Sequence, residues 1–128
     1  VTGAREAASV HGAAEGNLTI FYTPGSFELP AVASKMLGIA QWDAIVALGC
    51  VIRGETSHYD YVCRESARAL MDLATNSSLA MGFGILTCEN MQQAIVRADI
   101  NQKNKGGEAA RACLRMIDVK RHFRLNQK

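Results

Sequence analysis

Residues 49–62 read GCVIRGETSHYDYV and combine the residue types from which a small-molecule site is built. They follow an apolar run, Asp43–Leu48, that is typical of a buried parallel strand. Gly49 and Gly54 permit close backbone approach to a ligand, and His58 can transfer protons near neutral pH. Because ligands of open α/β sheets bind at the carboxyl ends of the strands, this segment is a candidate binding loop.

The same loop also has a purely structural interpretation. Thr56 and Ser57 are good N-cap residues for a helix that begins near His58. The free N–H groups of such a helix attract anions whether or not catalysis follows. A histidine at a helix start is commonly a surface or capping residue. The loop alone therefore leaves a catalytic and a capping role for His58 open.

Polar side chains follow each expected strand of the chain. Ser26–Glu28 follow the first strand, Arg53–His58 the second and Thr87–Asn90 the third, while Arg97 and Lys105 come shortly afterwards. Each has a structural explanation of its own, such as a carboxylate favoured by a helix dipole or an ordinary surface charge. Together they suit a ligand with a phosphate, a polyhydroxyl chain and a flat ring, since phosphate binds cations and rings bind aromatic faces.

The elements that must position these residues follow from the hydrophobic pattern. Apolar or β-branched runs predict strands at Asn17–Thr23, Asp43–Leu48 and Leu79–Leu86. Stripes of period 3.6 predict helices at Leu29–Leu37 and His58–Ala74, around Met91–Ala98 (capped by Thr87), over Ala109–Ile117, and in the first ten residues. This alternation predicts one domain over residues 1–128, a flavodoxin-like three-layer α/β fold with a parallel sheet and helices on both faces.

Composition narrows the classes of function. The 128 residues are 48% hydrophobic and 20% charged, and the net charge of +2 is too small to favour nucleic acid or membrane partners. The basic run Lys120–Arg124 fits a solvated helix end.

The sequence contains no C-x-x-C pair and no His cluster, so a zinc site is not expected. No bilayer-length apolar run or signal segment is present, and the cysteines fit a reducing compartment, so we expect a cytoplasmic protein. The cysteines are Cys50, Cys63, Cys88 and Cys113.

Four segments in order carry a resemblance to one family. They are Pro24–Pro30 (PGSFELP), Gly49–Val62, Phe83–Ala98 (FGILTCENMQQAIVRA) and Asn104–Ala109 (NKGGEA). From about Gly3 to Met116 the chain resembles lumazine synthases of riboflavin biosynthesis. The resemblance implies condensation of 5-amino-6-(D-ribitylamino)uracil with 3,4-dihydroxy-2-butanone 4-phosphate, without metal or redox cofactor. A non-catalytic flavin- or lumazine-binding shell protein on the same scaffold is the alternative. A generic flavodoxin-like binding domain does not account for NKGGEA.

The resemblance also assigns roles to individual positions. It implies that the ribitylaminouracil is held by Ser26, Phe27, Glu28, Cys50, Val51 and Ile52, with Glu28 toward the ribityl chain. It implies that Glu55 and Thr56 hold the phosphorylated ketone and that His58 shuttles protons. It further implies that Phe83, Arg97 and Lys105 reach the site from an adjacent subunit, with Arg97 on the phosphate.

Assembly and departures from the family follow from the same resemblance. It implies a homopentamer, alone or with twelve such rings packed into a sixty-subunit shell. The resemblance implies that family members with a longer segment at the position of Asp99–Asn104 are isolated pentamers. The short segment in this chain therefore favours the shell. We expect the family's N-terminal strand, with its stacking aromatic residue, to be missing before Val1. Smaller departures are Gly107, where larger residues are common, and Cys50 and Cys88, where small polar residues or cysteine occur.

Overall fold

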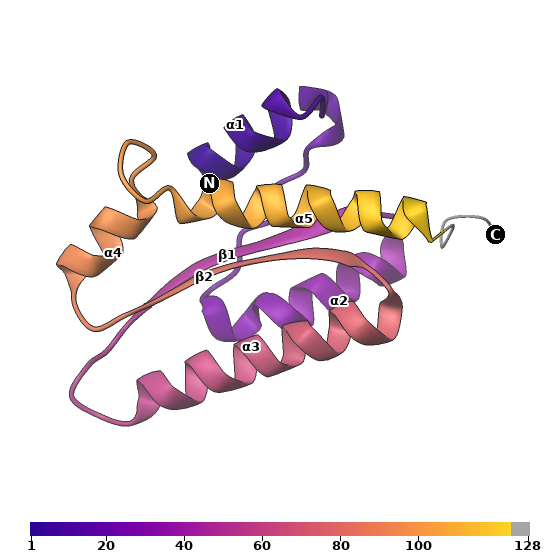
Figure 1. Cartoon of the computed structure of the whole chain (residues 1–128). Coiled ribbons are helices and arrows are strands. Elements are labelled where there is room, and N and C mark those ends of the chain that lie inside the picture. The colour runs from indigo at the N-terminus through magenta and orange to yellow at the C-terminus, as the bar shows by residue number, and fades with distance from the viewer. Residues whose placement is uncertain (124–128) are drawn as a thin grey trace.

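The computed structural model describes residues 1–123 and builds them around a two-stranded parallel sheet (Figure 1). Strand β1 spans Ala44–Ile52 and β2 spans Ala80–Cys88, paired in register from end to end. The other elements are α1 (Thr2–Val10), η1 (Glu15–Asn17), η2 (Ser26–Glu28), α2 (Leu29–Ile39), α3 (His58–Ser77), α4 (Met91–Ala98) and α5 (Lys105–His122), where η marks a 3₁₀ turn.

Helices cover both faces of the sheet. α2 and α3 pack on one face, α5 packs on the other, and α1 lies on the outer side of α5 (Figure 1). This arrangement confirms the α/β class, the parallel strand order and the placement of helices on both faces. None of the helices within residues 1–123 combines the length and the hydropathy needed to cross a bilayer.

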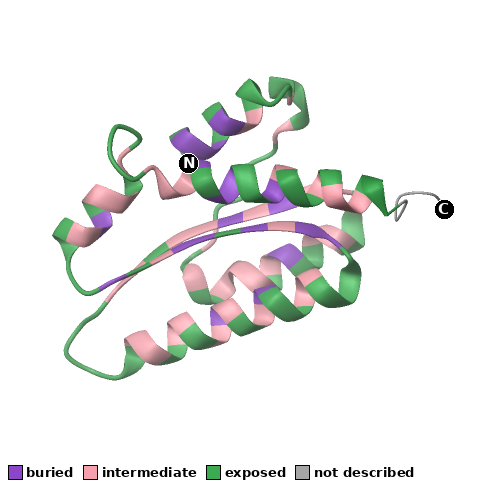
Figure 2. Cartoon of the chain, in the orientation of Figure 1, coloured by how far each residue is buried: buried purple, intermediate pink, exposed green. Residues whose placement is uncertain are grey.

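The face covered by α2 and α3 holds the larger hydrophobic core. Its buried members come from α2, both strands, α3 and the turn before β2: Ala33, Ile45, Ala47, Leu70, Leu79 and Ile85. Figure 2 shows these buried positions concentrated along the sheet and the inner sides of the helices. Trp42 closes the end of α2, because its indole N–H donates to the Met36 carbonyl at 2.9 Å. Burial of this apolar surface fixes α3, whose first turn carries His58, relative to β1.

The opposite face depends on how closely α5 approaches the strands. A Cβ at Gly82 would overlap the backbone carbonyl of Ala109 and lie 3.0 Å from the Cβ of Cys113. Cys113 is buried in this contact, with its Sγ 3.5 Å from the carbonyl oxygens of Ile45 and Ala80. Burial raises the pKa of the Cys113 thiol to about 11, so it acts as a neutral packing group.

The strand expected at Asn17–Thr23 is not formed. Residues 15–17 make the turn η1, and residues 18–23 run without regular structure. A strand exists only where a neighbour accepts and donates its backbone hydrogen bonds, and within residues 1–123 no strand pairs with this segment. Phe21 instead packs edge-on against Trp42, with ring centroids 6.2 Å apart. The β-branched and aromatic residues of this segment favour a strand, but a strand forms only when a neighbouring strand is present to pair with it.

Strand and helix ends also differ from the pattern-based expectation. β1 continues through Gly49–Ile52, which were expected to begin a loop, because these residues pair in register with Ile85–Cys88. Thr87 therefore lies inside β2 and does not cap α4. Asn90 takes that place, since its side-chain oxygen accepts from the Gln93 N–H at 2.9 Å.

We expect Gly82→Ala to lower the free energy of unfolding by about 1–3 kcal/mol, because the added methyl group meets backbone that cannot rotate away. Gly38→Ala is the matched control, since Gly38 lies in α2 with open space at its Cβ position. That change should be neutral or stabilise by up to about 1 kcal/mol. Urea unfolding of both variants at one protein concentration measures the difference. Equal midpoints would contradict close packing of α5 at Gly82.

Candidate functional site

The carboxyl ends of β1 and β2 bring two loops together. The register pairs Ile52 with Cys88 at the last position of each strand. The ladder continues one step further, because the Arg53 N–H donates to the Cys88 carbonyl at 2.9 Å. The loop after β1 and the turn that begins with Glu89 therefore leave the sheet side by side. This is the edge where polar side chains were expected to meet.

The loop after β1 delivers His58 to the first position of α3. The N-cap residue is Ser57, which makes no side-chain capping bond, while the Thr56 hydroxyl accepts from the His58 N–H at 3.3 Å. His58 is exposed, and within residues 1–123 its imidazole makes no hydrogen bond. No side chain of the described residues caps α3, and the imidazole of His58 faces solvent beside the loop.

Arg53 holds this loop in place, a role that the sequence did not reveal. Its guanidinium donates to Glu89 at 2.8 Å and to Asp60 at 3.2 Å, and lies 4.2 Å from the centre of the Tyr59 ring. Hydrogen bonds to Asp60 and Glu89 raise the pKa of Arg53, so it stays charged. A long-range Arg–Glu pairing between loops leaves no spacing signal in a single sequence.

The turn η2 packs against the same end of the molecule. A Cβ at Gly49 would overlap the Ser26 hydroxyl, so η2 lies directly on β1 at this point. The same turn also contacts α3. Phe27 is exposed, and Glu28 is the N-cap residue of α2 without a side-chain capping bond. The structure therefore brings Ser26–Glu28 beside the end of β1 and near the helix that begins with His58.

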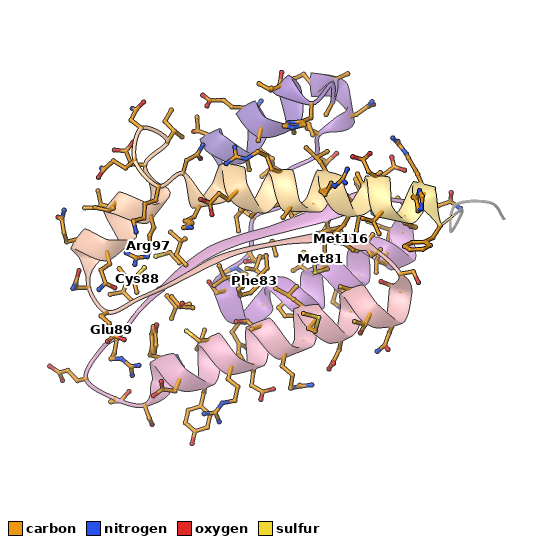
Figure 3. All side chains as sticks on the ribbon, viewed as in Figure 1. Met81, Phe83, Cys88, Glu89, Arg97 and Met116 are labelled. Carbon is orange, nitrogen blue, oxygen red and sulfur yellow. The ribbon has the colours of Figure 1, made fainter. Side chains whose placement is uncertain are left out.

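Three other predicted residues lie together in a separate cavity. Phe83, Arg97 and Lys105 line a depression of about 340 Å³ between β2, α4 and α5. Figure 3 shows Phe83 on β2 and Arg97 on α4, with Cys88 and Glu89 at the end of the strand. Phe83 is 50% exposed although it lies in a strand, so its ring is not part of the core of this chain. Thr87, one of the polar residues expected after the third strand, and Glu108, which was not predicted as a site residue, also line the cavity.

The two cations of the cavity differ in their partners. The Lys105 ammonium donates to Glu108 at 2.6 Å. Arg97 donates only to the Gln93 carbonyl of its own helix, at 3.2 Å. Within residues 1–123 no carboxylate pairs with Arg97. A half-buried guanidinium without a counter-ion is suited to a phosphate, which offers bidentate acceptors and negative charge. The partner Glu108 could have been suspected from its i,i+3 spacing to Lys105.

One chain does not unite all predicted residues in one pocket. The cavity of Arg97 includes none of Ser26–Glu28, Cys50–Ile52 or His58 in its lining. A larger open depression of about 490 Å³ lies between α2 and α3 and contains no predicted site residue. The site residues therefore fall into two groups: a loop group around η2, the end of β1 and His58, and a cavity group of Phe83, Arg97 and Lys105.

Comparison with known proteins identifies the family. The family model for 6,7-dimethyl-8-ribityllumazine synthase matches residues 1–121. A curated protein of that name from Methylobacterium radiotolerans is 51% identical over 109 residues, covering 85% of this chain and 66% of its own length. Others come from Anaeromyxobacter dehalogenans (42% identical, 94% of this chain, 75% of its own length) and Methylorubrum populi (48% identical, 94% and 73%).

These matches confirm the resemblance carried by the four motifs, and they favour the enzyme over the non-catalytic shell protein. The chain spans 66–75% of the length of these three relatives. Its parallel α/β architecture is consistent with the match. The chain belongs to the 6,7-dimethyl-8-ribityllumazine synthase family.

Proposed function

We propose that the protein condenses 5-amino-6-(D-ribitylamino)uracil with 3,4-dihydroxy-2-butanone 4-phosphate to give 6,7-dimethyl-8-ribityllumazine, phosphate and water. Family membership and the names of the curated relatives support this activity. The structural observation that carries it is the cavity in which Arg97 lies with Phe83 and Lys105 and is paired with no carboxylate of residues 1–123. An aromatic face and a free guanidinium are what a flat pyrimidine and a phosphate require.

The two groups of residues divide the substrates between them in this proposal. Ser26, Phe27 and Glu28 and the end of β1 hold the ribitylaminouracil, with Glu28 toward the ribityl hydroxyls. Cys50, Val51 and Ile52 form that end of β1. Glu55 and Thr56, in the exposed loop before α3, hold the phosphorylated ketone. The cavity group completes the site from an adjacent subunit, which explains why one chain does not unite the two groups.

The chemistry needs proton transfers and little else. The substrate amine attacks the ketone and forms a Schiff base with loss of water, phosphate is then eliminated, and the ribitylamino nitrogen attacks the remaining carbonyl and closes the ring with loss of a second water. In this proposal His58 moves protons in these steps, and the exposure of its imidazole beside the loop supports that role. Amine and ketone react in water unaided, so much of the rate comes from holding both substrates together. The four free thiols suit catalysis in the reducing cytoplasm.

Turnover is the direct test. The purified protein is mixed with both substrates, and formation of the lumazine is followed by its absorbance. Product that accumulates in proportion to protein concentration supports the enzyme. Binding of lumazine or flavin without any product would overturn it and favour the non-catalytic shell protein.

We expect Arg97→Ala to raise the Michaelis constant for the phosphorylated ketone about 10- to 100-fold, since a hydrogen-bonded charge contributes about 1.5–3 kcal/mol. The constant for ribitylaminouracil should change far less, because a neutral pyrimidine gains little from the guanidinium. Arg64→Ala is the control, an exposed arginine on α3. Equal weakening of both substrates by Arg97→Ala would make Arg97 a structural residue.

We expect His58→Asn to reduce kcat by a factor of up to about 10²–10⁴ without abolishing turnover, because proton transfer is lost while the two substrates are still held together. Asparagine also suits a helix start, so a purely structural role would leave the variant unaffected. Steady-state rates at saturating concentrations of both substrates measure the change. A variant with the rate of the unmodified protein would rule out proton transfer by His58.

Assembly is part of the same proposal. The two groups of site residues can meet only if a neighbouring subunit supplies one of them, and repetition of that contact around an axis closes a ring. Large apolar side chains are exposed on η2, β2 and α4, as an interface requires: Phe27, Phe83, Met91 and Ile95. The segment before α5 is a compact turn, in which the Asp99 carbonyl accepts from the N–H groups of Gln102 and Asn104.

We expect a pentamer as the smallest active form, with a shell of twelve pentamers favoured because the turn at Asp99–Asn104 presents no long insertion. Light scattering on the purified protein separates an isolated pentamer from the shell by mass. Activity measured on the same fractions shows which species turns over. A stable, active monomer or dimer would contradict both assemblies and the shared site.

A further inference from the structure

Arg53 connects three segments at the end of the sheet. It follows β1 directly, and its Nε donates to Glu89 in the turn between β2 and α4 at 2.8 Å. Its two terminal nitrogens each lie 3.2 Å from an oxygen of Asp60, in the first turn of α3. The guanidinium also lies over the Tyr59 ring. One side chain thus ties the start of the loop to its end and to the neighbouring turn.

The loop between Arg53 and His58 has few other restraints. A Cβ at Gly54 would find no atom within 4 Å, and Glu55 and Ser57 are exposed. Within residues 1–123 the loop side chains make one hydrogen bond, from the His58 N–H to the Thr56 hydroxyl. The backbone bond from Arg53 to Cys88 anchors one end of the loop. At the other end the Asp60 N–H donates to the Ser57 carbonyl at 3.0 Å, and the guanidinium bonds to Asp60 join this first turn of α3 to Arg53.

The charges around Arg53 favour a structural role over phosphate binding. Its guanidinium already faces two carboxylates, whereas Arg97 faces none in the described part of the chain. Isolated surface ion pairs contribute little to stability. An arginine that is bonded to two carboxylates and lies over an aromatic ring is held in one orientation more firmly than such an isolated pair. Removing it should leave the core intact, since Arg53 and its partners are partly exposed.

We propose that Arg53 is a positioning residue that fixes the loop at 53–57, and with it the imidazole of His58, against the substrates. The proposal rests on the proposed function, because it assigns Arg53 to the geometry of that reaction. Lysine cannot fully replace it, because one ammonium does not reproduce a planar fork that reaches Glu89 through Nε and Asp60 through both terminal nitrogens.

The test compares Arg53→Ala, Arg53→Lys and Glu89→Gln in the purified protein, each with and without His58→Asn. Arg68→Ala is the matched control, because Arg68 also pairs with two carboxylates, Glu65 and Asp72, but within α3 alone. We expect Arg53→Ala to lower kcat by up to about 100-fold, since small misplacements of a reacting group have effects of that order. Arg53→Lys should recover part of this loss, and the Michaelis constant for ribitylaminouracil should stay unchanged.

The pairing with His58→Asn separates positioning from folding. If Arg53 acts through His58, Arg53→Ala should have little further effect once the imidazole is gone, because the two changes are then not additive. If the two losses multiply, or if Arg68→Ala lowers kcat equally, the proposal is overturned. Should Arg53→Ala fail to fold, Glu89→Gln carries the same comparison with Asp60 still in place. An unmodified protein that forms no lumazine would refute the proposed function itself, a result distinct from these.

Discussion

The structure depends first on the close approach of α5 to the parallel strand pair. Gly82 and Gly84 leave no side chain between β2 and α5, and a Cβ at Gly84 would lie 3.0 Å from the Ala109 Cβ. The helix can therefore lie on the strand with its buried small residues inward. Because α5 begins at Lys105, this packing also fixes the cation and its partner Glu108 beside Phe83. The same contact that buries the core thus sets the walls of the cavity.

A second constraint is electrostatic and divides the arginines at the site into two kinds. Arg53 has its carboxylates supplied by the chain, so its charge is used to join the loop, α3 and the turn after β2. In the described part of the chain Arg97 donates only to a backbone carbonyl of its own helix, so none of these carboxylates neutralises its charge. The residue type is the same in both places. What distinguishes a structural cation from a binding cation is the set of acceptors that the fold places around it.

Much of the fold could be predicted from sequence, for reasons visible in particular elements. α2 and α3 were found because apolar residues recur every 3.6 positions along them, and the middles of β1 and β2 because their runs are apolar throughout. The strand ends were missed, since Gly49–Ile52 and Thr87–Cys88 are held by pairing with each other, and pairing leaves no local pattern. The strand predicted at Asn17–Thr23 was wrong for the converse reason, because a segment of strand-like composition does not form a strand without a neighbouring strand.

Only the parts of the candidate site that lie in recognisable sequence motifs could be predicted. Family resemblance identified the loop with His58 and the residues Phe83, Arg97 and Lys105. The contact of Arg53 with Glu89, which is distant in sequence, and that of Glu108 with nearby Lys105 became visible only in the structure. The exposed imidazole, unbonded within the described chain, differs from the oriented histidine of a catalytic triad. A reaction whose partners already combine in water requires less from any one side chain than from the surfaces that align the partners. In this chain the contacts that hold the loop and the cavity walls in place are those of Arg53 and the packing of α5 on β2.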